Sequence, residues 1–220
     1  YCVLGRVIER LTGKPYEQFV KEAVLAPAGI KAMRLGRSLE SGRAPGEVRY
    51  YTPDAETAGS VFPGAAGKVP WPYGGFNLEA MDAHGGWLAS AVDLARFAAA
   101  LRDASKCPLL KAETWRELHA APPAPVSRQP DGSLQATFYA CGWSTRPVGN
   151  PPRSANYWHT GSLPGTYTLL VRRWDGLAWA ALFNQRSKDR KLDGEIDPAL
   201  HRAADAVKEW PKEDFFARFA

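Results

Sequence analysis

The chain has 220 residues, of which 45% are hydrophobic and 23% are charged, a composition that excludes a disordered or fibrous protein. It contains no run of 18 apolar residues, so we expect no membrane-spanning helix. The 28 basic residues exceed the 23 acidic ones by five but are scattered, whereas a nucleic-acid surface needs a concentrated basic stripe, so we expect no nucleic-acid partner.

Residues 1–30 are predicted to form a pair of short helices. Apolar residues recur with helical spacing from Val3 to Leu11, and Gly13 is suited to end this helix. Pro15 suits the first turn of the second helix, and Pro27 closes it.

Residues 31–89 form a long region with little periodicity, many glycines and prolines, and several aromatic residues. A loop of this length is often functional, and its aromatic residues argue against disorder. Trp71 and Tyr73 are candidate walls of a groove, with a loop packed on its own aromatics as the alternative. His84 is a further candidate groove residue, with a purely structural hydrogen bond as the alternative.

Residues 90–125 are predicted to be helical. Ser90 and Asp93 have the spacing of a capping box at the start of the first helix. A second helix is predicted over about 111–119, with Trp115 facing inward. His119 and His201 fall at positions that we expect to face solvent.

The sequence period changes to that of strands over residues 135–184. One strand is predicted from Thr137 to Ser144, and three more over 157–161, 167–173 and 178–184. Asp175-Gly176 predicts a hairpin between the last two strands. Residues 195–220 are predicted to form a C-terminal helix and a hydrophobic tail that includes Phe215–Phe219.

The sequence gives no support for a metal site or a cofactor. Cys2, Cys107 and Cys141 fit no metal-ligand spacing, and their odd number leaves at least one thiol unpaired. The HExxH, CxxC, GxGxxG and P-loop motifs are all missing, as is the G-x-S-x-G elbow of α/β-hydrolases. We therefore expect neither a metal nor a cofactor.

The most informative stretch is Tyr157 to Gly165, in which the triplet His159-Thr160-Gly161 precedes Ser162 and a Pro-Gly turn. We expect His159 and Thr160 to point into a groove beside a strand edge. Gly161 would let a ligand approach the backbone, and the N–H of Ser162 would be free to bind an oxyanion. The alternative is that His159 is a strand histidine bonded within the core.

Three segments resemble serine β-lactamase and penicillin-binding-protein-like hydrolases. His159-Thr160-Gly161 with the Ser-Leu-Pro-Gly and strand–Asp-Gly–strand that follow is similar to their third motif, in its class C-like His-x-Gly form. Residues 1–13 resemble the helix after their Tyr-x-Asn motif. Residues 85–97 resemble their Gly-Gly…Ser-x-x-Asp-Leu-x-Arg-Phe segment.

The resemblance implies an α+β, β-lactamase/transpeptidase-like fold, N-terminally incomplete, with helices packed on the faces of an antiparallel sheet. Residues 1–220 would then be the C-terminal part of one domain. It also implies a serine hydrolase of β-lactamase, D-amino-acid peptidase or esterase type, which cleaves amide or ester bonds through an acyl-enzyme. In that setting His159 bonds toward the substrate or the base network, Thr160 contacts a carboxylate or carbonyl, and Ser162 N–H is an oxyanion donor.

The departures from the family pattern concern its catalytic residues. The chain contains neither Ser-x-x-Lys nor Tyr-x-Asn, so we expect the nucleophile and its bases to lie upstream of residue 1 and the chain alone to be inactive. The partner of the complete protein would be a small-molecule or peptide substrate, and the resemblance suggests a bacterial periplasmic or secreted location. The alternative is a non-catalytic binding or structural module with a peptide- or glycan-binding groove, which the upstream sequence would distinguish.

The strand 178–184 is apolar and carries neither a charge nor a proline. In the family that this chain resembles, N-terminal strands pair with this strand. A bare apolar edge promotes strand addition, so we expect self-association through this strand, coverage by the Phe215–Phe219 tail, or coverage by an upstream segment.

Overall fold

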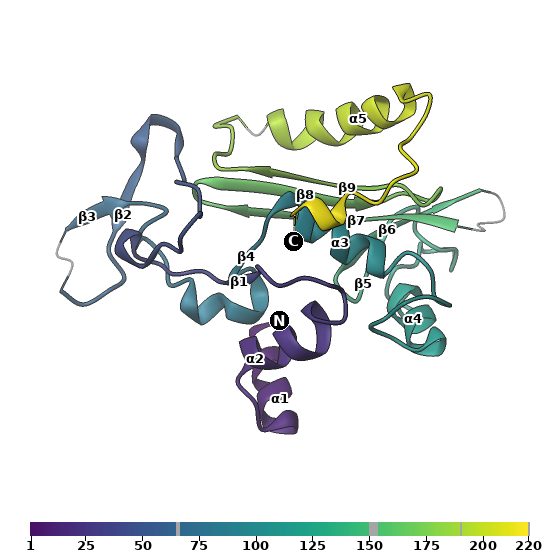
Figure 1. Cartoon of the computed structure of the whole chain (residues 1–220), viewed down its shortest axis with the longest axis horizontal. Helices are drawn as coiled ribbons and strands as arrows, with labels where there is room; N and C mark the ends of the chain where they lie inside the picture. The colour runs from purple at the N-terminus through teal and green to yellow at the C-terminus, as the bar shows by residue number, and fades with distance from the viewer. Residues whose placement is uncertain (65–66, 150–153, 190, 220) are drawn as a thin grey trace.

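A computed structural model describes residues 1–64, 67–149, 154–189 and 191–219. Its centre is a five-stranded antiparallel sheet in the order β5-β6-β7-β8-β9, with helices on both faces (Figure 1). The strands are β5 (Phe138–Ala140), β6 (Trp143–Val148), β7 (Ser154–Leu163), β8 (Thr166–Arg172) and β9 (Ala178–Phe183). The α+β class and the antiparallel sheet predicted from the sequence are confirmed.

The core centres on β8, because β7 and β9 flank this strand on its two edges. Tyr167, Leu169 and Val171 alternate along β8, share one face of the sheet and are each at most 3% exposed. Full burial of a side chain such as Leu169 contributes about 1.5–3 kcal/mol. The strand that carries His159 therefore pairs with the most deeply buried strand of the sheet.

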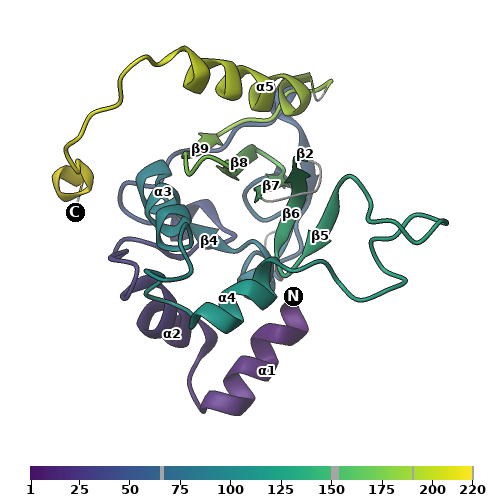
Figure 2. The same cartoon turned by 90° about the vertical axis from the view of Figure 1, so that its right-hand side faces the viewer.

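Two helices cover opposite faces of the sheet, α3 (Ala91–Ala100) and α5 (Lys191–Ala206) (Figures 1 and 2). α3 packs against β8 and β9. α5 lies on the other face, where Tyr167 donates a hydrogen bond to the backbone oxygen of Asp193 at 3.4 Å and the ring of Trp179 meets His201. α5 begins before the predicted residue 195. The capping box of Ser90 and Asp93 at the start of α3 is confirmed.

The sequence predicted one strand from Thr137 to Ser144, and this prediction is wrong. The structure has two short strands, β5 and β6, joined by Cys141-Gly142. Cys141 has φ 43° and Gly142 has φ 91°. A two-residue hairpin turn of type I′ needs positive φ at both central residues, and a cysteine rarely signals such a turn. The hairpin places Tyr139 opposite Ser144.

The hairpin predicted at Asp175-Gly176 is present between β8 and β9. The N–H of Arg173 donates to the carbonyl of Leu177, and Gly176 has φ 89°, which favours glycine. The helix predicted over about 111–119 is α4 (Ala112–His119).

The N-terminal helices are α1 (Cys2–Thr12) and α2 (Tyr16–Val20), the latter continuing into a π-helical turn, η1 (Lys21–Leu25). Gly13 ends α1 in the left-handed conformation, as predicted. Within residues 31–89, β1 (Arg34–Leu35) pairs with β4 (Trp87–Leu88), and β2 (Thr57–Gly59) pairs with β3 (Lys68–Pro70). Three 3₁₀ turns connect them: η2 (Glu40–Gly42), η3 (Pro53–Ala55) and η4 (Glu79–His84).

β9 is an outer strand of the sheet. Within the described residues, the segment 49–51 of the same chain contacts the outer edge of β9 just beyond its C-terminal end. There the N–H of Tyr51 donates to the carbonyl of Asn184 at 2.9 Å, and Asn184 Nδ2 donates to the carbonyl of Arg49. The prediction that the tail covers this edge is wrong, because η5 (Phe216–Phe219) packs on α3 instead, with the Arg96 guanidinium 4.8 Å from the ring of Phe216. Pairing with a second copy and coverage by an upstream segment stay predictions. None of the described helices is both long and apolar enough to cross a membrane.

Candidate functional site

The candidate site lies where β7 extends past the end of β6. The pairing of β6 with β7 ends at Ser144 and Trp158, whereas the pairing of β7 with β8 continues to Leu163 and Thr166. Residues 159–163 therefore have a strand neighbour on one side, and among the described residues the other side is open.

Two backbone amides face this open edge. Pro164-Gly165 is a two-residue loop that closes on the pair Leu163–Thr166. In an antiparallel hairpin, residues bonded to the partner strand alternate with residues whose N–H and C=O point the other way. Because Leu163 closes the hairpin, Thr160 and Ser162 direct their backbone groups away from β8. The edge thus offers two N–H donors and two carbonyl acceptors to a ligand.

His159 is exposed beside this edge, which contradicts the alternative of a histidine enclosed in the core. Its Nε2 lies 3.0 Å from the hydroxyl of Tyr139, which in turn lies 3.2 Å from the hydroxyl of Tyr1. One consistent arrangement has Tyr1 donating to Tyr139 and Tyr139 donating to Nε2 of His159. Burial and the hydrogen bond with Tyr1 raise the pKa of Tyr139 well above its usual range, so its phenol keeps the proton at neutral pH.

The side chains of the predicted triplet do not all point the same way. Successive strand residues alternate, so the side chain of Thr160 leaves the sheet on the face opposite His159, the face on which α5 lies. Ser162 shares the face of Thr160, and within the described residues its buried Oγ has no hydrogen-bond partner. A side chain at Gly161, the residue between Thr160 and Ser162, would lie 2.5 Å from Thr168 Oγ1. This position therefore requires a small residue.

The long aromatic loop reaches the site at the turn that follows β7. A side chain at Gly165 would come within 2.7 Å of Pro72 Cγ and 2.8 Å of Tyr50 Cβ. Tyr73, next to Pro72, accepts a hydrogen bond from the N–H of Tyr50 at 2.9 Å, and Trp71 stacks under the guanidinium of Arg186 at 5.8 Å. Trp71 and Tyr73 therefore lie on a loop packed against the end of β7.

His84 lies beside the start of α1. Its Nδ1 lies 3.3 Å from Sγ of Cys2, the residue that follows Tyr1. It is exposed, and its partner is the first residue of α1. A hollow of about 620 Å³ lies away from this edge, against Trp115, Trp174 and Leu177. No three His, Cys, Asp or Glu side chains of the described residues gather as a metal site.

The sequence did not predict the contact of Tyr139 with His159 or the burial of His119. Tyr139 fell inside the single strand predicted for 137–144, so nothing placed it near His159. His119 was predicted to face solvent but is 8% exposed, with Nε2 2.7 Å from a guanidinium nitrogen of Arg172 and Nδ1 2.7 Å from the carbonyl of Trp115. His201 is half-buried against Trp179 rather than free in solvent.

Comparison with known proteins is consistent with this architecture. A family model described as Beta-lactamase matches residues 1–202. Similar solved structures include a D-amino acid amidase from Ochrobactrum anthropi (21% identity, TM-score 0.64, 93% of this chain and 55% of that chain) and a D-stereospecific amidohydrolase from Streptomyces sp. (21%, 0.58, 82% and 47%). A penicillin-binding protein from Bacillus halodurans is also similar (16%, 0.55, 89% and 52%).

The chain spans about half the length of these solved structures, and at these identities the likeness shows the fold. No curated protein matches the chain in sequence. The family match covers more than nine-tenths of the sequence. The chain belongs to the β-lactamase family.

Proposed function

We propose that this chain forms the strand side of the active site of a serine hydrolase that cleaves amide bonds through an acyl-enzyme. The observation that carries the proposal is the open edge of β7, where the amides of Thr160 and Ser162 lie beside the exposed imidazole of His159. The sequence contains no Ser-x-x-Lys and no Tyr-x-Asn, so the nucleophile and its bases would come from residues outside these 220.

The chemistry assigned to the edge follows from amide hydrolysis. Attack on the amide carbonyl places negative charge on its oxygen, and preorganised N–H donors stabilise that charge. The N–H of Ser162 would supply one such donor. His159, held by Tyr139, would bond to the substrate or to the base network at the same edge.

The substrate class that this edge favours is an extended amide. A peptide-like ligand can lie along an open strand edge and use main-chain hydrogen bonds, while its side groups give specificity. Two of the similar solved structures are of a D-amino acid amidase and a D-stereospecific amidohydrolase. Both support a small D-amino acid amide or a peptide end as the substrate of the complete protein.

The test is a titration of the ¹⁵N-labelled chain with D-phenylalanine amide, followed by NMR. At about 10 mM ligand, which would saturate a site of millimolar affinity, the amide resonances of Thr160 and Ser162 should move. The amide of Gly176, in the hairpin beyond β8, serves as the control and should stay in place. The absence of any shift at Thr160 and Ser162 would overturn the proposed binding edge.

The missing nucleophile is tested separately with a serine-directed fluorophosphonate. We expect no serine of the chain to be labelled, because an isolated oxyanion donor does not form a covalent adduct. Stoichiometric labelling of one serine would show that the nucleophile lies within these residues and would overturn that part of the proposal. Binding by a longer chain that has no reactive serine would favour the non-catalytic binding module.

A further inference from the structure

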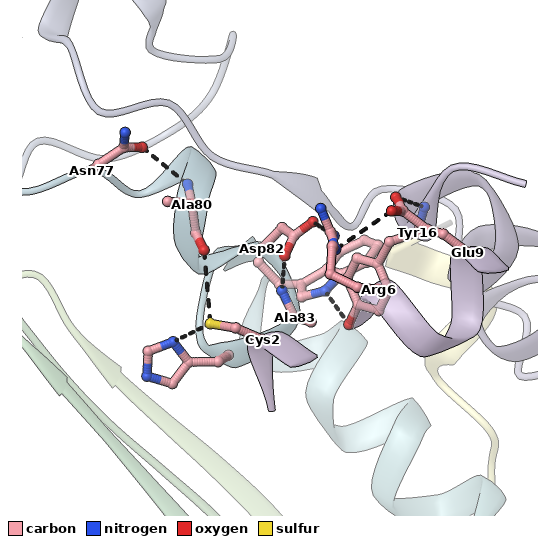
Figure 3. A network of polar contacts seen from close by, with 10 residues as sticks. Cys2, Arg6, Glu9, Tyr16, Asn77, Ala80, Asp82 and Ala83 are labelled. Atoms are coloured by element: carbon pink, nitrogen blue, oxygen red, sulfur yellow. Dashed lines mark hydrogen bonds and ion pairs between the residues drawn. The ribbon is translucent and has the colours of Figure 1, made fainter. Parts of the chain in front are cut away.

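A thiol and an imidazole meet at the start of α1, outside the strand edge. Cys2 Sγ lies 3.3 Å from Nδ1 of His84 and 3.7 Å from the carbonyl oxygen of Ala80. Figure 3 shows the contact between Cys2 and Ala80. A cysteine within hydrogen-bond reach of a histidine base has the arrangement of an activated nucleophile. We propose that Cys2 and His84 form a reactive thiol, a covalent-modification site for small uncharged carbon electrophiles.

The surroundings of Cys2 are electropositive. Cys2 is the first residue of an 11-residue helix whose first turn carries no acidic side chain, and the amino end of a helix favours negative charge. Arg6 lies one turn further on, within electrostatic reach of Cys2. The guanidinium of Arg6 pairs with Asp82, which offsets part of its charge (Figure 3).

The fold holds the two reacting groups on separate elements. Cys2 belongs to α1, and His84 is the last residue of η4. Gly5 of α1 fits closely against η4, where a side chain would meet Ala83 Cβ at 2.6 Å. This close contact between α1 and η4 keeps the thiol beside the imidazole.

Reaction with iodoacetamide, the probe for this site, balances as follows. The sulfur of Cys2 forms a bond to the methylene carbon, the carbon–iodine bond breaks and iodide leaves. The thiol proton passes to Nδ1 of His84. The inference does not depend on the proposed hydrolase function, because no ligand of the β7 edge takes part.

The chain contains its own reference thiol. Cys141 is exposed in the β5–β6 turn, whereas Cys2 is half-buried, so exposure alone predicts that Cys141 reacts faster. A positioned base contributes about 100-fold or more in an evolved site, and half-burial works against it here. We expect iodoacetamide to modify Cys2 about tenfold faster than Cys141 at neutral pH.

The experiment follows alkylation of Cys2, Cys107 and Cys141 in the folded chain over time by peptide mass spectrometry. In urea at about 8 M the rates of Cys2 and Cys141 should become equal, because unfolding separates the thiol from the imidazole. The variant His84→Gln should lose the excess rate of Cys2 and leave that of Cys141 unchanged, and the control His201→Gln should change neither.

Two results would overturn the inference. One is a Cys2 rate in the folded chain that is no higher than that of Cys141. The other is an unchanged Cys2 rate in His84→Gln. If His84→Gln disturbs the fold, the rate of the half-buried Cys107 will rise, and the comparison of the folded with the unfolded wild type then decides alone.

Discussion

The buried pair of His119 and Arg172 should make the stability of this fold depend on pH. Arg172 is 5% exposed, and its guanidinium bonds to Nε2 of His119 and to the carbonyl of Leu101. Nε2 can accept that bond only from a neutral imidazole. Burial, and then the nearby charge of Arg172, lower the pKa of His119 below its ordinary value of 6.5.

The sign and size follow from linkage. Because the pKa of His119 is lower in the folded chain, the unfolded chain binds the proton more readily. The contribution of His119 to the free energy of unfolding is complete above the pKa of about 6.5 that this residue has in the unfolded chain. This contribution is lost as the pH falls toward the lower pKa of His119 in the folded chain. Between about pH 7.5 and pH 5.5 the free energy of unfolding should fall by at most about 1.4 kcal/mol from this residue.

The assay is urea unfolding at these two pH values for the wild type and for His119→Gln. Glutamine keeps an oxygen that can accept from Arg172 but does not titrate, so the variant should show a smaller pH dependence of stability. Carboxyl groups that are stabilised in the fold, such as Glu79, titrate below this window. An equal pH dependence in both proteins would refute the role assigned to His119.

Three further predictions concern other parts of the fold. Ser90→Ala should destabilise the chain by about 1 kcal/mol through loss of the α3 cap, measured by urea unfolding, whereas a change below about 0.3 kcal/mol would contradict the capping role. Gly165→Ala should destabilise the chain by about 1–3 kcal/mol, clearly more than Gly132→Ala. Both glycines have positive φ, but only at Gly165 would a side chain clash with Pro72 and Tyr50. Equal losses of stability would refute this packing argument. Tyr139→Phe should weaken D-phenylalanine amide binding by about fivefold, the value of one hydrogen bond, in the NMR titration, and unchanged affinity would remove Tyr139 from the site.

Local sequence signals predicted much of the fold. Gly13 ends α1, Ser90 and Asp93 cap α3, and Asp175-Gly176 turns β8 into β9, because each signal acts within a few residues of the backbone it controls. The strand that carries His159 was located the same way, from a β-type run followed by Pro-Gly.

Features that depend on distant contacts could not be predicted this way. His119 is buried because Arg172 comes from a strand 53 residues away, and helical spacing alone placed it outside. Tyr139 meets His159 only because Cys141 adopts φ 43°, which turns one predicted strand into a hairpin. The pair of Cys2 and His84 likewise joins positions 82 residues apart.

The central claim is that the open edge of β7 binds the substrate, and amide hydrogen exchange along residues 159–163 tests it most directly. In the free chain the amides of Thr160 and Ser162 should exchange rapidly, whereas those of Gly161 and Leu163, bonded to β8, should be protected. Addition of D-phenylalanine amide should slow Thr160 and Ser162 and leave Gly161 and Leu163 unchanged. Equal protection of all four amides in the free chain, or no slowing at Thr160 and Ser162 with ligand, would contradict the account.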